Sequence, residues 1–274
     1  MTLPQTIDDV LDELDKIIEQ SFQDNDYIAI FAYVYRRTTA AIKEGIEREQ
    51  FEDGKRMERF DVIFANLYLQ AYQQYRAAQR PCLSWHTCFE ARHARITLLQ
   101  HILMGMNAHI NLDLGIAAAR TSEGRHILDM KDDFMKVNYI LYSIIDDIQA
   151  SISKVSRLMF VIDWLGGRKD EQMIDFGIRR YREQAWRVAC ELALAREEDK
   201  DSLIAEVDLK TSKLNQHIRN PHSILLRMML RLVSIFEIRD TRKILEILQA
   251  GERRIEPAYL AARQEKPEII KKAR

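Results

Sequence analysis

The sequence predicts an all-α protein: a single-domain multi-helix bundle built around one buried central helix at about residues 96–120. Glycine and proline, which disfavour helix interiors, number only 9 and 5 among 274 residues, and long stretches contain neither. No segment shows a convincing strand pattern, and neither an internal repeat nor a Pro/Ser-rich linker divides the chain. With 47% hydrophobic residues, the chain is long enough to bury one large core.

Nine helices are expected in chain order, and side-chain chemistry marks several of their ends. The N-terminal helix is acidic and amphipathic. The boundary markers are the turn Asp53-Gly54, Pro81, the pair Gly166-Gly167, and the N-cap Asn220 followed by Pro221. The expected helices cover about residues 5–22, 26–48, 56–79, 83–93, 96–120, 132–165, 171–197, 200–218 and 221–249.

The last stretch of the chain differs from the rest. Residues 251–274 turn polar and basic and contain two prolines. We expect them to lie on the surface as an extension of a single helical domain that covers residues 1–250.

Charge and composition argue against several classes of function. Lys and Arg number 41 against 42 Asp and Glu, so the net charge of -1 gives no electrostatic case for nucleic acid or for an anionic membrane. The N-terminus does not resemble a signal or transit peptide, which predicts a cytoplasmic protein. The cysteines at 82, 88 and 190 form no Cys-x-x-Cys pair, which argues against thiolate zinc and a disulfide framework. The oligomeric state is left open.

The most informative segment is residues 98–119, which is apolar on every side and yet contains five polar residues. A helix that is apolar all round belongs in the interior, where an unpaired polar group costs a few kcal/mol. The five therefore need hydrogen-bond partners or a functional role. Gly105 leaves room in this helix for close approach of another helix or a ligand. The five polar residues are His101, Asn107, His109, Asn111 and Asp113.

Helix geometry sorts these residues onto two faces. His109 and Asp113 are four residues apart, with a rise of about 6 Å, so they would share a metal ion or form a pair in which the carboxylate orients the imidazole. His101 lies about 12 Å along the axis from His109, which is too far to bind the same ion. Asn107 and Asn111 form a second pair about 160° around the helix from His109.

Three residues elsewhere are candidates to complete a site. Asn138 interrupts the apolar stripe of the helix expected at 132–165, either as a partner for the His109 or Asn107 face or as a device that fixes helix register. Asp61 would bring a second carboxylate toward His109 and supply the third ligand that a metal site needs. His86 is the second choice for that ligand.

Three segments carry a family pattern: FEDGKRMERFDVIFANLYLQAY at 51–72, LQHILMGMNAHINLDLGIA at 99–117 and DFMKVNYIL at 133–141. Together they resemble a bacterial family of helical proteins catalogued as a domain of unknown function. The resemblance covers about residues 30–195, and the motif Asn-Ala-His-Ile-Asn-x-Asp-Leu at 107–114 is its most specific part. It implies an all-helical domain and brings no known activity. It directs attention to Asn107, His109, Asn111, Asp113, Asp133 and Asn138.

Two hypotheses describe this centre. In the first, the protein is a hydrolase of a small polar substrate, and its catalytic residues His109 and Asp113 bind a divalent metal or activate a water. In the second, it is a noncatalytic helical module whose buried polar residues lock helices together or bind a small molecule. No phosphate-cradling loop and no Gly-x-Ser-x-Gly elbow is present, so a divalent metal is the one cofactor considered. The ligand-binding candidates are Asn107, Asn111, Asn138 and His101, and the metal-binding candidates are His109, Asp113, Asp61 and His86.

The burial and surroundings of the polar residues distinguish these two hypotheses further. We expect Asn107, His109, Asp113 and Asn138 to be buried, with His109 and Asp113 facing a polar cleft. Without a third acidic or histidine side chain within about 5 Å of that pair, the centre would instead be a hydrogen-bond network or a pocket for an organic ligand. The pair Asp146-Asp147 is expected to face solvent.

Overall fold

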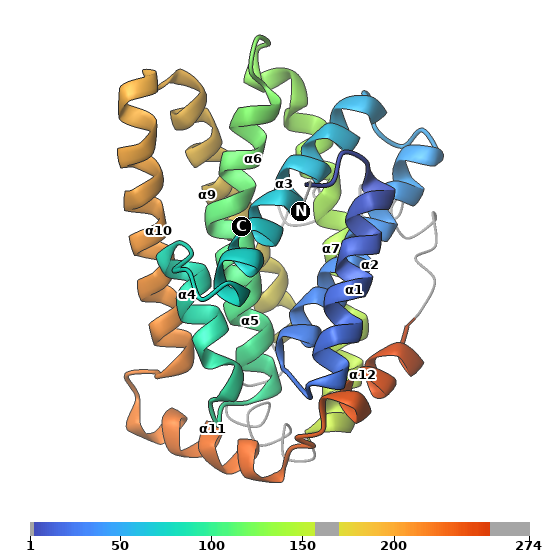
Figure 1. Ribbon diagram of the computed structural model, residues 1–274, viewed down its shortest axis with the longest axis vertical. Coiled ribbons are helices and arrows are strands. Elements are labelled where there is room, and N and C mark those ends of the chain that lie inside the picture. The colour runs from blue at the N-terminus through green and yellow to red at the C-terminus, as the bar shows by residue number, and fades with distance from the viewer. Residues whose placement is uncertain (1–2, 157–169, 253–274) are drawn as a thin grey trace, which may run out of the picture.

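Several helices begin where a short polar side chain caps them. The Thr6 hydroxyl accepts a hydrogen bond from the backbone of Asp9, whose carboxylate bonds back to Thr6, and Thr97 forms the same reciprocal cap with Gln100. The structure is a computed structural model that describes residues 3–156 and 170–252 (Figure 1). Its elements are α1 (Ile7–Gln23), α2 (Ile28–Glu47), α3 (Gly54–Arg76), α4 (Leu83–Glu90), η1 (Ala91–His93), α5 (Leu98–Ala108), η2 (His109–Asp113), α6 (Leu114–Thr121), η3 (Ile127–Met130), α7 (Lys131–Val155), α9 (Asp170–Leu194), α10 (Glu197–Arg219), α11 (Ile224–Phe236) and α12 (Thr241–Ala250).

The long helices run roughly along one axis, and the segment α5–η2–α6 passes between them (Figure 1). This segment contacts α2, α3, α4, α9 and α10, and residues 107–118 are all buried. Gly115 permits the close contact between α6 and α9, because a Cβ there would lie 2.9 Å from Val188 Cγ1. Helices make up every regular element of residues 3–156 and 170–252, which confirms the all-α prediction.

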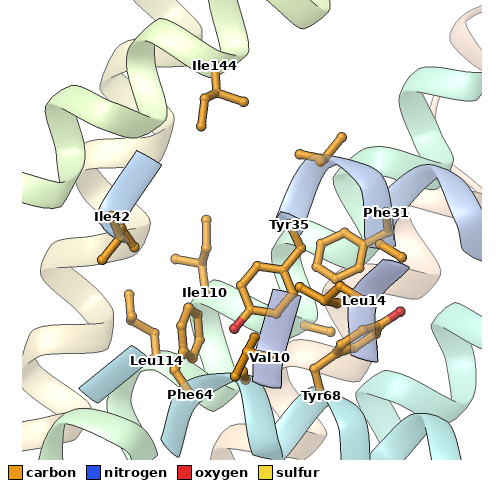
Figure 2. Packing of buried hydrophobic residues seen from close by; sticks show 14 of the residues in the cluster. Val10, Leu14, Phe31, Tyr35, Ile42, Phe64, Tyr68, Ile110, Leu114 and Ile144 are labelled. Carbon is orange, nitrogen blue, oxygen red and sulfur yellow. The ribbon is translucent and has the colours of Figure 1, made fainter. Parts of the chain in front are cut away.

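The hydrophobic core joins α1, α2, α3 and α7 to the central segment. Figure 2 shows Tyr35 from α2 close to Val10 from α1 and Phe64 from α3, with Ile110 and Leu114 of the central segment nearby. Burial of each large apolar side chain of this kind contributes about 1.5–3 kcal/mol, which makes the core the main source of stability.

Three predicted helices differ from the structure. The central helix at 96–120 contains a π-helical turn at 109–113 instead of running as a continuous α-helix. The helix at 132–165 ends at Val155, and the Gly166-Gly167 marker lies outside the described residues. The helix at 221–249 is two helices, because Asp240 caps a new helix by accepting a hydrogen bond from the backbone of Arg242.

The start of α11 also differs from its prediction. Asn220 is the C-cap of α10 and not an N-cap. The N-cap of α11 is Ser223, whose hydroxyl accepts from the backbone of Leu226, so the helix begins three residues after Pro221. In residues 3–156 and 170–252, no helix is long and apolar enough to cross a membrane. The division of the chain at residue 250 stays a prediction, since residues 253–274 lie outside the described part.

One acidic pair was expected in solvent. Asp147 is instead buried on α7 and forms an ion pair with Arg37 of α2, with 2.8 Å between the Nη2 and Oδ2 atoms. Both side chains are less than 10% exposed. The prediction for Asp147 was wrong because the stripe of α7 that packs inward is wide enough to include a carboxylate with a partner on α2.

Candidate functional site

The central segment changes its helical geometry where its polar motif lies. Residues His109–Asp113 form a π-helical turn, closed by a hydrogen bond from the backbone N–H of Leu114 to the carbonyl oxygen of His109. All five residues of the turn are buried. Single π turns within α-helices are rare and occur frequently at functional sites, because they widen the helix and redirect its side chains.

Within this turn, His109 and Asp113 form a hydrogen-bonded pair. The distance from His109 Nδ1 to Asp113 Oδ2 is 3.0 Å, and both side chains are buried. Trp85 on α4 donates its indole N–H to the same carboxylate oxygen at 2.8 Å. Trp85 was not predicted as part of the site, although a buried indole N–H requires an acceptor.

The electrostatics of the pair follow from burial. Burial lowers the pKa of His109 well below its ordinary value, so the imidazole is neutral at neutral pH. Burial raises the pKa of Asp113, and the hydrogen bond from Trp85 opposes that shift. We place the imidazole proton on Nδ1, where it is donated to Asp113, which leaves a lone pair on Nε2 that points away from the carboxylate.

Aromatic rings enclose His109. The imidazole stacks on Phe64, with ring centroids 3.6 Å apart and an interplanar angle of 10°. Tyr35 and Phe31 make T-shaped contacts with the imidazole, with ring centroids 4.2 and 5.7 Å from the centroid of the His109 ring. Gly105 makes this packing feasible, because a Cβ there would clash with the Phe31 ring. The expected close approach at Gly105 is therefore confirmed, and the neighbour is an aromatic ring.

A cavity of about 50 Å³ lies beside this ring. His109 lines it together with mainly apolar side chains from α2, α3, η2, α6 and α7, several of which are visible in Figure 2: Phe31, Phe64, Ile110, Leu114 and Ile144. The prediction that His109 faces a polar cleft was wrong, because mainly aromatic and aliphatic side chains line the cavity. His109 Nε2 is buried and has no hydrogen-bond partner among residues 3–156 and 170–252.

Two other polar side chains of the cavity wall, Thr38 and Arg182, are engaged within the protein, whereas the Tyr35 hydroxyl is buried and has no hydrogen-bond partner among the described residues. The Thr38 hydroxyl donates to the carbonyl oxygen of Val34 at 3.1 Å. Arg182 donates to the carbonyl oxygen of Phe134 and lies 4.5 Å from the centre of that ring. His109 Nε2 is therefore a buried acceptor that is available to a ligand at this cavity, and the Tyr35 hydroxyl is a second unpartnered group of the wall.

The asparagine face of the same segment forms hydrogen bonds that hold helices together. Asn107 Nδ2 donates to the Thr211 carbonyl oxygen and to Asn215 Oδ1, each at 2.9 Å. Asn107 Oδ1 accepts from Asn111 Nδ2 at 2.7 Å. Asn215 Nδ2 in turn donates to the carbonyl oxygen of Ser84 at 3.1 Å. This chain of hydrogen bonds ties the central segment to α10 and α4 and engages both polar atoms of the Asn107 side chain.

Asn138 and His101 lie apart from the pair. Asn138 is only half-buried, contrary to the prediction, and its amide reaches Met135 Sδ on its own helix at 3.7 Å. His101 is buried and packs on Tyr27 with ring centroids 4.5 Å apart, and burial lowers the pKa of His101 to about 3. Neither residue lines the cavity beside His109.

Asp61 and His86 do not complete a metal site with the pair. In the described residues, no group of three or more His, Cys, Asp and Glu side chains is placed to hold a metal ion. His86 lines a separate surface groove with Tyr75 and Glu90. Asp61 is buried, neither of its carboxylate oxygens has a hydrogen-bond partner, and burial raises its pKa to about 7. The structure therefore gives no support to the predicted ligand set.

Asp133, which the family resemblance brought forward, anchors a loop. Its carboxylate accepts hydrogen bonds from the backbone N–H groups of Glu52 and Asp53 at 2.8 and 3.1 Å. Arg56 adds an ion pair at 2.9 Å. These contacts fix the entry to α3, the helix that carries Phe64, so Asp133 supports the site from a distance.

Comparison with known proteins gives one match. The model of a family described as "Family of unknown function (DUF5995)" matches residues 7–221. Neither the curated proteins nor the solved structures gave a match to the chain. The matched range contains α1 through α10 and thus the whole His109 centre.

Proposed function

Since the chain belongs to that family of unknown function, we propose from the geometry of the His109 centre that the protein binds a small, mainly apolar molecule with one hydrogen-bond donor. The observation that carries the proposal is His109 Nε2, a buried acceptor without a partner beside an apolar cavity. An unsatisfied buried acceptor costs about 1–3 kcal/mol, and a ligand that donates to it recovers this cost. The ligand's ring or chain would lie among the aromatic side chains.

The volume of the cavity beside His109 limits the size of the ligand. A cavity of about 50 Å³ accommodates roughly three to five water-sized groups, since each requires about 10–15 Å³. A molecule of five non-hydrogen atoms fits this estimate. With at most about 1.5 kcal/mol per non-hydrogen atom, such a ligand would bind no more tightly than micromolar.

A pair of isosteric rings tests the proposal. Pyrrole donates an N–H and furan does not, although both have five ring atoms. In titrations followed by ¹H–¹⁵N NMR, we expect pyrrole to bind at least about fivefold more tightly than furan, because of one hydrogen bond. His109→Phe retains a ring but removes the acceptor, and it should abolish this preference. Thr38→Val is the control, because the Thr38 hydroxyl is already used within α2. Equal binding of furan and pyrrole to the unchanged protein would contradict the proposal.

The second candidate is a metal-independent hydrolase in which His109 activates a water. The observation that favours it is the pairing of His109 Nδ1 with Asp113, which orients the imidazole and leaves Nε2 as a base. The cavity has room for a water and for part of a small substrate. Because burial lowers the pKa of His109, the base would already be deprotonated at neutral pH.

Methyl acetate, with five non-hydrogen atoms, is a suitable probe for hydrolysis. The hydrolase candidate predicts turnover that His109→Phe removes and that shows no imidazole titration near pH 6.5, since the His109 pKa lies well below that value. Product would be followed by NMR. Pyrrole binding without any turnover would leave the protein as a binding module.

A further inference from the structure

Helix α11 has an exposed apolar face. Val233 and Ser234 are buried against the bundle, whereas six large apolar side chains on the opposite side are 48–70% exposed. At 100° per residue, these six fall within an arc of about 120°. Contiguous apolar surfaces of this kind mark interaction sites. The six are Ile224, Leu225, Met228, Leu232, Ile235 and Phe236.

A groove of about 410 Å³ with an excess of positive charge adjoins this face. Four arginines line the groove and no aspartate or glutamate does: Arg95, Arg219, Arg227 and Arg231. In the described part of the chain, none of these four guanidinium groups forms an ion pair. Residues 220–236 contain no acidic residue at all. The net charge of -1 therefore conceals a local basic region.

The placement of α11 suits a planar partner. Figure 1 shows α11 crossing one end of the bundle, at a steep angle to the long helices. The groove lies at the same end, where α10 finishes and the segment before α5 begins. The arginines at 227 and 231 are on α11 itself, at one edge of its exposed apolar arc. A flat anionic surface would meet the apolar face and the guanidinium groups together.

We propose that this end of the protein docks on an anionic phospholipid membrane. The exposed face of α11 enters the interfacial region, and lipid phosphates bind the four arginines of the groove. A second copy of the chain fits less well, because symmetric packing of α11 would bring arginines together without carboxylates. α11 lies beyond the residues of the family match, so the inference does not depend on the His109 proposal.

Vesicle sedimentation of the full chain tests the proposal. We expect binding to vesicles of phosphatidylcholine with phosphatidylglycerol, weakening at high salt, and no binding to phosphatidylcholine alone. The double variant Arg227→Gln/Arg231→Gln should lower the partition coefficient about 30-fold, and Leu225→Gln/Met228→Gln should also lower it. The control variants Arg187→Gln and Leu194→Gln change exposed residues of α9 and should bind like the unchanged protein.

Any of the following results would overturn the proposal. The first is failure to sediment with anionic vesicles, and the second is unchanged binding by the double arginine variant while it retains its helical circular dichroism. The third is a dimer in sedimentation equilibrium that Leu232→Gln converts to monomer, which would assign the apolar face to a second copy. Binding of glycerol phosphate in solution without vesicle binding would limit the groove to soluble anions and would equally reject a membrane partner.

Discussion

The two polar faces of the central segment are equally buried and yet differently satisfied. On one face, every polar atom of the Asn107 side chain has a partner, from Asn111 to Asn215. On the other, His109 uses Nδ1 with Asp113 and leaves Nε2 without a partner. Both faces belong to the same buried helical segment. The difference in hydrogen bonding therefore indicates that the two faces have different roles.

A satisfied buried polar network holds helices in one arrangement, whereas an unsatisfied buried group lowers stability. Proteins retain such unfavourable groups at sites that bind or react with another molecule. The asparagine face therefore explains how α10 and α4 are fixed to the central segment. The histidine face, with its π turn, aromatic enclosure and cavity, is the candidate site for a ligand.

The largest effect is expected at Asp61, another buried group that has no hydrogen-bond partner among the described residues. Its charge adds to burial in raising the pKa of Tyr35, which packs on His109. Burial raises the folded-state pKa of Asp61 to about 7 from 3.8, so the folded state binds the extra proton between these values. The free energy of unfolding should fall as pH rises from about 4 to 7, by as much as about 4 kcal/mol. Asp61→Asn should remove that contribution.

Urea denaturation at several pH values would measure this slope. Asp12→Asn, at an exposed position of α1, is the matched control and should retain the slope of the unchanged protein. If Asp61→Asn retained the same slope as well, Asp61 would not carry the unfavourable charge.

The asparagine face should show the next largest effect. Asn107→Ala leaves the Thr211 carbonyl, Asn215 Oδ1 and Asn111 Nδ2 without their partner, so we expect a loss of about 3 kcal/mol in the free energy of unfolding. Asn111→Ala removes the hydrogen bond from Asn111 Nδ2 to Asn107 Oδ1 and should cost about 1 kcal/mol. Chemical denaturation measures the loss in the free energy of unfolding for both variants. Equal losses would show that the network does not centre on Asn107.

A smaller effect is expected at Trp85. Trp85→Phe keeps a ring in the core but removes the N–H that donates to Asp113, which should cost about 1–2 kcal/mol. It should also raise the pKa of Asp113 further, since the indole hydrogen bond favours the carboxylate. Thermal melts measure the first effect. An unchanged melting temperature would mean that Trp85 does not orient the pair.

Much of the fold and part of the site were predictable from sequence. Helical periodicity with few glycines predicted an all-α protein, and an apolar run with polar residues predicted the buried His109 and Asp113. The π turn was not predictable, because a change of hydrogen-bond register within a helix leaves no compositional trace. Trp85 and Phe64 reach His109 from other helices, and single-helix spacing says nothing about such contacts.

Contacts between side chains that lie far apart in the sequence could not be predicted either. Asn138 lies on the predicted stripe of α7 but bonds within its own helix. Asp61 is buried on α3 and, within the part of the chain that the structure describes, belongs to no group of potential metal ligands. Both predictions assumed that polar residues on inward faces converge. In this protein, some of them meet only backbone, neighbouring turns or apolar walls.

The protonation state of His109 tests the central claim most directly. Long-range ¹H–¹⁵N correlation spectra of the imidazole, recorded from pH 8 to pH 5, distinguish the two neutral tautomers from the imidazolium. We predict a neutral ring with its proton on Nδ1 throughout this range, because burial lowers the His109 pKa and Nδ1 donates to Asp113. Pyrrole should then shift the Nε2 resonance alone. An imidazolium signal, or a neutral ring with its proton on Nε2, would contradict the account, since neither leaves an acceptor facing the cavity.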